Sequence, residues 1–174
     1  APCRSGQNLN EGEPVKLTES FNYPATTAQV FGLVTSQEFR EQSCERQGAS
    51  DYTVTVTENA GTTTVKIVRT MPSDMPDFIR KLTGETVTIT QVEKWSAADS
   101  SGTHTAEVSV DIHGQPASMK GTSVIRSEGD GAVMALDGNV KVSIPLLGRK
   151  IEPEVAKAIS ASLRDEVEFG KTQL

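Results

Sequence analysis

Strand-length segments with alternating side chains occupy most of residues 16–144, and a single helix-length segment follows them. In residues 52–57, for example, Tyr52, Val54 and Val56 alternate with threonines. A period of two is typical of a β-strand with one buried face. The connecting segments are short, as in antiparallel pairs, whereas parallel strands need long crossover connections. The pattern therefore predicts an antiparallel sheet followed by one long helix.

Turn and capping residues set the expected boundaries of the elements. Thr26 or Thr27 is expected to cap a first short helix, and Ser36 a second one. Ser73 is expected to cap a third short helical segment, which ends near residue 84. Asp130-Gly131 is expected to form a two-residue turn between the last two strands. The predicted strands are 16–23, 52–57, 62–71, 85–96, 103–112, 117–127 and 132–144.

The long helix is predicted from Ile151 to Phe169, with Pro153 in its first turn. Its apolar stripe consists of Ile151, Val155, Ala158, Ile159, Ser162 and Phe169. Glu166 lies in the same sector, and we expect its carboxylate to overhang the sheet in solvent; a carboxylate that points into a cavity is the alternative. One stripe cannot cover both faces of a sheet, so the fold class is α+β, with a curved antiparallel sheet of about six to seven strands wrapped around the C-terminal helix.

The charge of the chain argues against two classes of partner. There are 17 Lys and Arg against 23 Asp and Glu, which gives a formal net charge of −6. Nucleic acids and anionic membrane surfaces are bound by basic patches, so neither is an expected partner. No apolar run approaches the ~18 residues of a membrane span, so no integral membrane segment is expected. The sequence carries no indication of the oligomeric state.

The two cysteines, Cys3 and Cys44, lie far apart and away from both histidines. A zinc site is therefore not supported. Two thiols in a chain of 174 residues are typical of a reducing compartment, which favours unpaired cysteines and a cytoplasmic location; a Cys3–Cys44 disulfide is the alternative. Residues 1–15 hold little to bury and are expected to be a flexible leader, and residues 16–170 a single domain.

Several short motifs resemble functional sites but fit simpler roles. Asp111 and His113 share one strand face, as two metal ligands would, but they border a turn and no third ligand is near in sequence. His104 begins an apolar strand face, either as a strand-end residue or as a polar group at a cavity mouth. Asp74 and Asp77 fit as charges at a helix start. No nucleophile–base pair is evident, so no metal or cofactor is expected and an enzymatic activity is not favoured.

The order of elements and three segments resemble a known family. The segment Gly138–Glu152, GNVKVSIPLLGRKIE, looks like the signature of the actinobacterial domain of unknown function 2505 family. That family belongs to the START-like (SRPBCC) superfamily, with the birch-pollen-allergen-like proteins and the polyketide cyclases. The stretch from Tyr23-Pro24-Ala25 to Val30-Phe31 and the stretch from Met71-Pro72 to Phe78 also match. The resemblance covers residues 16–168 and implies a helix-grip fold with an apolar cavity between sheet and C-terminal helix.

The same resemblance implies that a small hydrophobic or amphipathic ligand, such as a lipid or a polyketide, binds in this cavity. A cyclase, dehydratase or hydrolase that uses the cavity is one alternative; it needs an acid–base pair, for which His104, Glu166 and Asp137 are the candidates. A protein-interaction domain without a ligand is the second alternative. Methionines suit irregular cavity walls. The expected cavity residues are Met71, Met75, Phe78, Trp95, His104, Met119, Ile151, Val155 and Ile159.

Overall fold

The computed structural model describes residues 14–174, which form a seven-stranded sheet in the order β1-β7-β6-β5-β4-β3-β2. Every neighbouring pair of strands is antiparallel. The strands are β1 (Val15–Tyr23), β2 (Asp51–Asn59), β3 (Thr62–Pro72), β4 (Thr86–Trp95), β5 (His104–Ile112), β6 (Ala117–Glu128) and β7 (Gly131–Val142). The helices are α1 (Thr27–Val34), α2 (Gln37–Arg46), α3 (Asp77–Thr83) and α4 (Gly148–Lys171).

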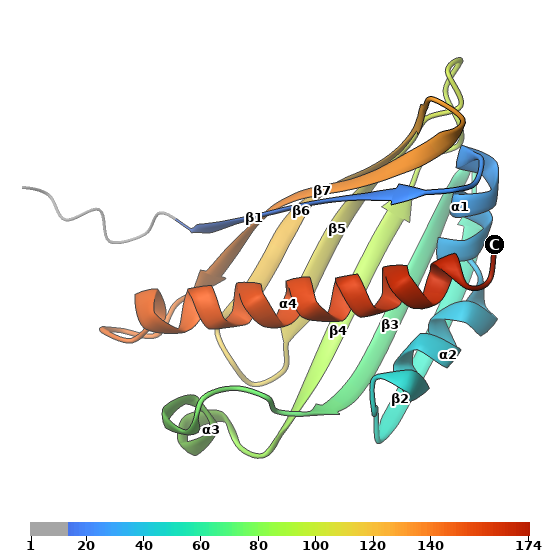
Figure 1. The fold of residues 1–174 in the computed structure, drawn as a ribbon. Coiled ribbons are helices and arrows are strands. Elements are labelled where there is room, and N and C mark those ends of the chain that lie inside the picture. Colours follow the sequence, from blue (N-terminus) through green and yellow to red (C-terminus); the bar gives the residue numbers. More distant parts are fainter. Residues whose placement is uncertain (1–13) are drawn as a thin grey trace, which may run out of the picture.

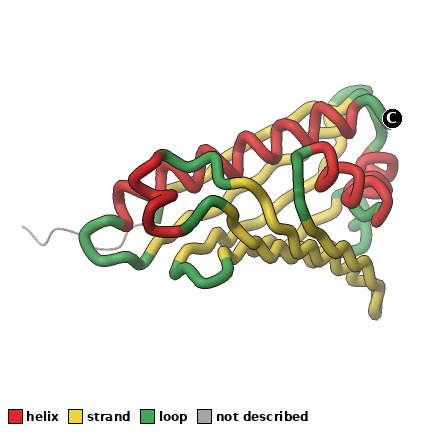
Figure 2. Tube along the Cα trace, turned by 90° about the horizontal axis from the view of Figure 1, so that it is seen from below, coloured by secondary structure: helices red, strands yellow, loops and turns green. Residues whose placement is uncertain are grey.

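The sheet curves around α4, so the predicted α+β helix-grip architecture is confirmed. In Figure 1, α4 crosses the concave face of the sheet, and its C-terminal end lies beside α1 and α2. Figure 2 shows α4 along the inside of the curved layer of strands. Thirteen residues of the predicted 1–15 leader lie outside the described residues, and Val15 already belongs to β1.

Alternation within the strands decides which side chains lie on the concave face of the sheet. In β3, Val65 and Ile67 are buried, whereas Lys66 between them is exposed. In the neighbouring β2, Val54 is buried between the exposed Thr53 and Thr55. The threonines of the alternating segments thus lie largely on the convex face, where a hydroxyl group stays hydrated. The concave face and α4 share the apolar core.

A pair of glycines permits the close approach of β6 and β7. Gly121 and Gly138 are direct partners in the register of these strands. A Cβ atom on Gly121 would lie 2.4 Å from the carbonyl oxygen of Asp137 and 2.7 Å from Cα of Gly138. Both neighbours are backbone atoms that cannot rotate away. The sheet can therefore adopt this geometry only with glycine at position 121.

Substitution of Gly121 by alanine is expected to lower the free energy of unfolding by about 1–3 kcal/mol, as overpacking does. Gly32, in α1, provides the matched control because a Cβ atom at this position would point into open space. Gly32→Ala is expected to raise stability by about 0.5–1 kcal/mol, because alanine favours the helix. Urea unfolding followed by circular dichroism measures both changes. Equal effects of the two substitutions would contradict the steric explanation.

The predicted caps of the first two helices are confirmed, but the third is wrong. Thr26 accepts a hydrogen bond from the backbone N–H of Gln29, and Ser36 from that of Phe39. Helix α3 begins only at Asp77, and no side chain caps it. Ser73 is instead buried, and its backbone N–H donates to the carbonyl of Glu85 at 2.9 Å. This hydrogen bond joins the residue that follows β3 to the residue that precedes β4, so Ser73 extends the pairing of these two strands and does not cap a helix.

The turn between β6 and β7 lies one residue earlier than predicted. Glu128 pairs with Gly131, so Gly129 and Asp130 form the turn. Gly129 has a φ of 58°, a conformation that glycine adopts without strain. Gly131 is required for a different reason: a Cβ atom there would lie 2.5 Å from the carbonyl oxygen of Tyr23 in β1.

Helix α4 begins three residues before the predicted start, at Gly148. The backbone N–H of Gly148 donates to the carbonyl of Ile144, and a Cβ atom on Gly148 would lie 2.2 Å from the carbonyl oxygen of Val142. Pro153 is consequently inside the helix and beyond its first turn. Glu152 is buried and accepts a hydrogen bond from the backbone N–H of Val142 at 3.1 Å. The glycine and the glutamate together fix the start of α4 against the end of β7.

Among the described residues, none of the helices combines the length and the apolar character that a membrane crossing requires.

Cys44 is buried, while Cys3 lies outside the described residues. The expectation of two unpaired thiols therefore stays a prediction.

Candidate functional site

A cavity of about 590 Å³ lies between the concave face of the sheet and α4. Apolar side chains of β4, β5, β6 and β7 line it on one side, among them Ile89, Val110, Met119 and Leu136. On the other side α4 contributes Ile151, Val155, Ala158 and Ile159 among others. The stripe of α4 that the sequence predicts thus faces the cavity as well as the core.

The burial of β4 shows that α4 does not pack directly onto this part of the sheet. Val87, Ile89 and Gln91 lie on the concave side and line the cavity, yet all three are only partly buried. In a filled core such inward-facing strand residues touch many neighbours and lose nearly all their exposure. Trp95 on the same face is buried, so the free space lies toward the start of β4.

The cavity opens between α4 and the segment that connects β3 to β4. Pro72, the last residue of β3, and Asp74 of the connecting segment line the cavity and are exposed, and so is Lys157 of α4. Met75 and Ile79 from the same connection contribute apolar surface. The mouth is therefore charged at its rim and apolar just inside.

Seven of the nine expected cavity residues line the cavity: Met71, Met75, Trp95, Met119, Ile151, Val155 and Ile159. Phe78 and His104 do not belong to the lining. Phe78 is 46% exposed on the surface of α3. His104 is buried beside α1, where its ring stacks on Phe31 and its Nδ1 atom lies 2.9 Å from the carbonyl oxygen of Ser96. His104 is therefore a strand-end residue at the start of β5, and not a polar group at the cavity mouth.

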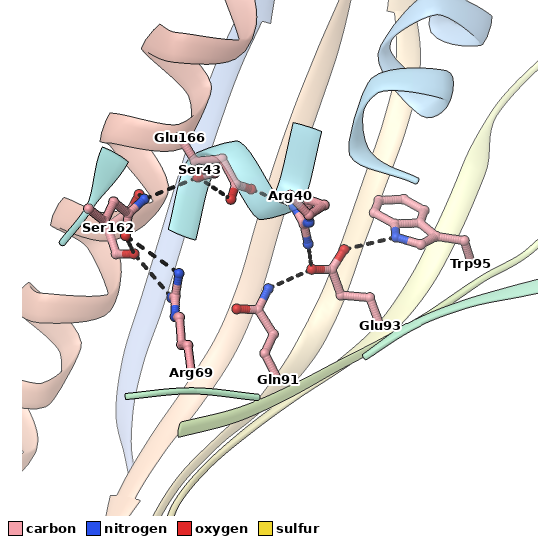
Figure 3. Close-up of polar contacts among 9 residues, drawn as sticks. Arg40, Ser43, Arg69, Gln91, Glu93, Trp95, Ser162 and Glu166 are labelled. Atoms are coloured by element: carbon pink, nitrogen blue, oxygen red, sulfur yellow. Dashed lines mark hydrogen bonds and ion pairs between the residues drawn. The ribbon is translucent and has the colours of Figure 1, made fainter. Parts of the chain in front are cut away.

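A cluster of charged side chains closes the end of the cavity near α2 (Figure 3). Arg40 of α2 forms ion pairs with Glu93 of β4 and with Glu166 of α4. Arg40 and Glu93 are both buried. Glu93 also accepts hydrogen bonds from Nε1 of Trp95 at 2.9 Å and from Nε2 of Gln91 at 2.5 Å. Glu166 is partly buried, with 13% of its side chain exposed. One cation and two anions from three distant segments thus form a largely buried triad.

The oxygens of both carboxylates in the triad have hydrogen-bond donors. Oε1 of Glu93 accepts from Trp95, and its Oε2 accepts from Arg40 and Gln91. Oε1 of Glu166 accepts from Arg40, and its Oε2 accepts from the hydroxyl of Ser43 at 2.9 Å. Buried charges are tolerated when they are paired and hydrogen-bonded in this way. Each carboxylate oxygen of the triad therefore has a donor, and the three side chains together carry a net charge of −1.

A second polar group surrounds Arg69 of β3, next to the triad. Nη2 of Arg69 donates to the hydroxyl of Ser162 at 3.2 Å, and Nη1 to Oε1 of Gln47 at 3.5 Å. The Ser162 hydroxyl in turn donates to Oε1 of Gln47 at 2.6 Å. Figure 3 shows Arg69 rising from the sheet toward Ser162 on α4. Arg69 and both of these partners line the cavity.

Burial dominates the titration of two groups near these clusters. Burial raises the pKa of Tyr23 well above its ordinary value, and the negative charge of Glu166 raises it further. Burial also raises the pKa of the Cys44 thiol, while the positive charge of Arg69 acts in the opposite direction. Both groups therefore remain protonated and neutral at physiological pH.

Comparison with known proteins places this geometry in a family. The family model described as a protein of unknown function, DUF2505, matches residues 18–174. The chain belongs to the DUF2505 family. Curated proteins gave no match to it. The predicted membership in this family is thereby confirmed.

Solved structures share the helix-grip fold of this chain. A STAR-related lipid transfer protein from Xanthomonas axonopodis is 12% identical, with a TM-score of 0.61, and the match covers 92% of this chain and 89% of that one. The lipid transfer and protein localization domain of human StarD13 is 11% identical with a TM-score of 0.61, over 95% and 82% of the two chains. An aromatase/cyclase from Streptomyces sp. R1128 is 9% identical with a TM-score of 0.56, over 92% and 93%. At these identities the likeness shows the shared fold.

The expectation that Glu166 lies in solvent is wrong for this DUF2505 chain. Glu166 lines the cavity and pairs with Arg40, so the alternative of an inward-pointing carboxylate is correct. The reason is α2, which packs beside the C-terminal half of α4 and supplies the cation. The other two candidates for an acid–base pair lie elsewhere: Asp137 is exposed on β7, and His104 is outside the cavity.

The remaining motifs occupy surface positions. Asp111 is exposed, and Nε2 of His113 lies 2.5 Å from the hydroxyl oxygen of Thr90. Asp77 stands in the first turn of α3 and pairs with Arg80. In the part of the chain that the structure describes, no three His, Cys, Asp or Glu side chains are grouped as metal ligands.

Proposed function

We propose that this protein binds a small hydrophobic or amphipathic ligand in the cavity between the sheet and α4. The cavity carries the proposal: its volume of about 590 Å³ falls within the ~300–1,000 Å³ typical of small-molecule sites. Its walls are mostly apolar, and its buried charged groups, Arg40, Arg69 and Glu93, gather at one end. An apolar ligand would restore the dispersion contacts that the lining side chains lack while the cavity is empty.

The structural neighbours support this proposal by analogy of fold. Two of them carry the words lipid transfer in their names, and one is an aromatase/cyclase. A lipid or a polyketide-like molecule is therefore the class of ligand that we propose. The proposal includes a cytoplasmic location and no nucleic-acid partner, in keeping with the cysteine content and the net charge of −6.

The triad favours binding over acid–base catalysis in the same cavity. Its two carboxylates, Glu93 and Glu166, are both engaged in ion pairs with Arg40. Neither of the two histidines lines the cavity. A binding protein needs only orienting polar groups, and those are present.

A cavity-filling variant tests the proposal. Ala158 lines the cavity and is exposed to it, so a larger side chain at this position has room to enter without displacing the core. Ala158→Trp is expected to weaken binding of the neutral fluorescent probe N-phenyl-1-naphthylamine by at least about tenfold, because the indole occupies the volume that the probe needs. Fluorescence titration measures the affinity.

The matched control is Lys150→Trp, which adds the same side chain to α4 at an exposed position outside the cavity lining. We expect this control to bind the probe as tightly as the parent protein. No saturable binding to the parent protein, or equal binding by both tryptophan variants, would contradict the proposal. The latter result would instead favour a site on the surface.

A further inference from the structure

Arg69 differs from the other buried charged residues of the cavity because no carboxylate accompanies it. It is 8% exposed. Within residues 14–174, no Asp or Glu oxygen lies within the 4.0 Å ion-pair distance of its guanidinium group, whereas Arg40 has two such partners and Arg46 has Asp165. Its two hydrogen-bond partners, Gln47 and Ser162, are neutral. A full positive charge is therefore buried among uncharged groups.

The hydrogen bonding of Arg69 is also incomplete. A guanidinium group carries five N–H donors. Only two hydrogen bonds from Arg69 are found among the described residues, and the longer spans 3.5 Å. Its Nε atom is buried without a partner. Unmet donors of a buried charge cost stability unless something else accepts their hydrogen bonds.

The neighbouring triad does not supply the missing partner. It carries a net charge of −1, which balances Arg69 only from a distance. The oxygens of Glu93 and Glu166 already have donors of their own. Ser162 and Gln47 also bond to each other, and this places neutral groups around the guanidinium. The carboxylate oxygens of the triad thus have donors, although Nε of Arg40, like Nε of Arg69, is buried without a partner. Of the two buried arginines in the described part of the chain, Arg69 is the one that lacks an anion.

We infer that Arg69 binds the acidic head group of an amphipathic ligand whose apolar tail fills the body of the cavity. The inference rests on the proposed function and specifies its ligand. A planar guanidinium group matches a carboxylate, with which it forms paired hydrogen bonds. Since Arg40 and Arg46 are already paired, one free cation is available, so the head group carries a single negative charge. The apolar lining that includes Ile89, Val110 and Ile159 then surrounds the tail.

The test compares ligands that differ only in the head group. Dodecanoate, 1-dodecanol and dodecyl phosphate are each used to displace N-phenyl-1-naphthylamine from the full chain at pH 8, below their micelle-forming concentrations. We expect dodecanoate to bind at least about tenfold more tightly than dodecanol, as a hydrogen-bonded charge pair predicts. Equal affinities, or tighter binding of dodecyl phosphate than of dodecanoate, would overturn the inference while leaving the proposed function intact. No displacement by any of the three, together with no binding of the probe, would overturn both.

Variants then assign the preference to Arg69. Arg69→Gln is expected to bind dodecanoate and dodecanol with similar affinity, and Arg69→Lys to keep part of the preference because it keeps the charge. Arg164→Gln is the control, since it removes an exposed cation of α4 that lies outside the cavity lining; it is expected to keep the full preference. Circular dichroism confirms that each variant folds. If Arg69→Gln does not fold, an Arg69→Lys variant with an unreduced preference, or an Arg164→Gln variant that loses it, contradicts the assignment.

Discussion

Replacing Arg40 by methionine is expected to cost about 3–5 kcal/mol of the free energy of unfolding at pH 7, because it leaves the buried Glu93 and the largely buried Glu166 without their cation. Arg40 is 3% exposed and pairs with both Glu93 and Glu166. A small domain is stable by only about 5–15 kcal/mol in total. The variant is therefore expected to unfold at much lower urea concentration, as circular dichroism can measure.

The loss is expected to shrink as the pH falls from 7 toward 4. Without Arg40, no cation lies beside the buried Glu93 carboxylate, and burial favours its protonated form in the folded variant. The folded variant then binds more protons than its unfolded chain, which stabilises it as the pH decreases. The two proteins are therefore expected to come closer in stability at acidic pH.

Two further variants separate charge from packing. Arg46→Met removes an arginine of the same helix whose pair with Asp165 is largely exposed, and we expect a loss below about 1 kcal/mol. The triple variant with Arg40→Met, Glu93→Gln and Glu166→Gln is expected to recover part of the stability, since no buried carboxylate remains. An Arg40→Met deficit that is the same at pH 7 and at pH 4 would show that Arg40 acts through packing alone.

The elements that the sequence predicts correctly are those that local chemistry decides. Alternation buries Val54 and exposes its neighbours Thr53 and Thr55, whatever strand pairs with them. The caps at Thr26 and Ser36 need only backbone groups three residues away. The failed cap at Ser73 depends instead on Glu85, which lies beyond the whole of α3. Local patterns could not reveal that contact.

The apolar part of the cavity was predictable, whereas its charged end was largely not. Arg69 shares a strand face with Val65 and Ile67, and an arginine on such a face is a signal of a buried charge. Arg40 gives no comparable signal, because α2 is polar around most of its circumference and its partners follow 53 and 126 residues later. The resemblance to the family predicted a cavity, and only the packing of α2 beside α4 shows which charges meet at its end.

Trp95→Ala is expected to lower the free energy of unfolding by about 3–5 kcal/mol, the usual cost of truncating a fully buried aromatic side chain. Trp95 is 1% exposed, and its ring packs edge-on against Phe31 at a centroid distance of 6.3 Å. Its Nε1 atom also donates to Glu93, which would lose one of its donors. Because Trp95 is the only tryptophan, unfolding of the variant has to be followed by circular dichroism.

Two companions distinguish the contributions of the ring and of its N–H group. Trp95→Phe keeps most of the apolar volume but removes the hydrogen bond to the Glu93 carboxylate, so an intermediate loss of about 1.5–3 kcal/mol is expected. Phe78→Ala truncates an aromatic side chain that is 46% exposed on α3, and its effect is expected to stay within about 0.5 kcal/mol, as at other surface sites. If Phe78→Ala proves as costly as Trp95→Ala, α3 must pack against the body of the protein and cover part of the cavity mouth. If Trp95→Phe is as stable as the parent, the hydrogen bond from the indole N–H to Glu93 contributes no stability, and Trp95 stabilises the protein through the packing of its ring alone.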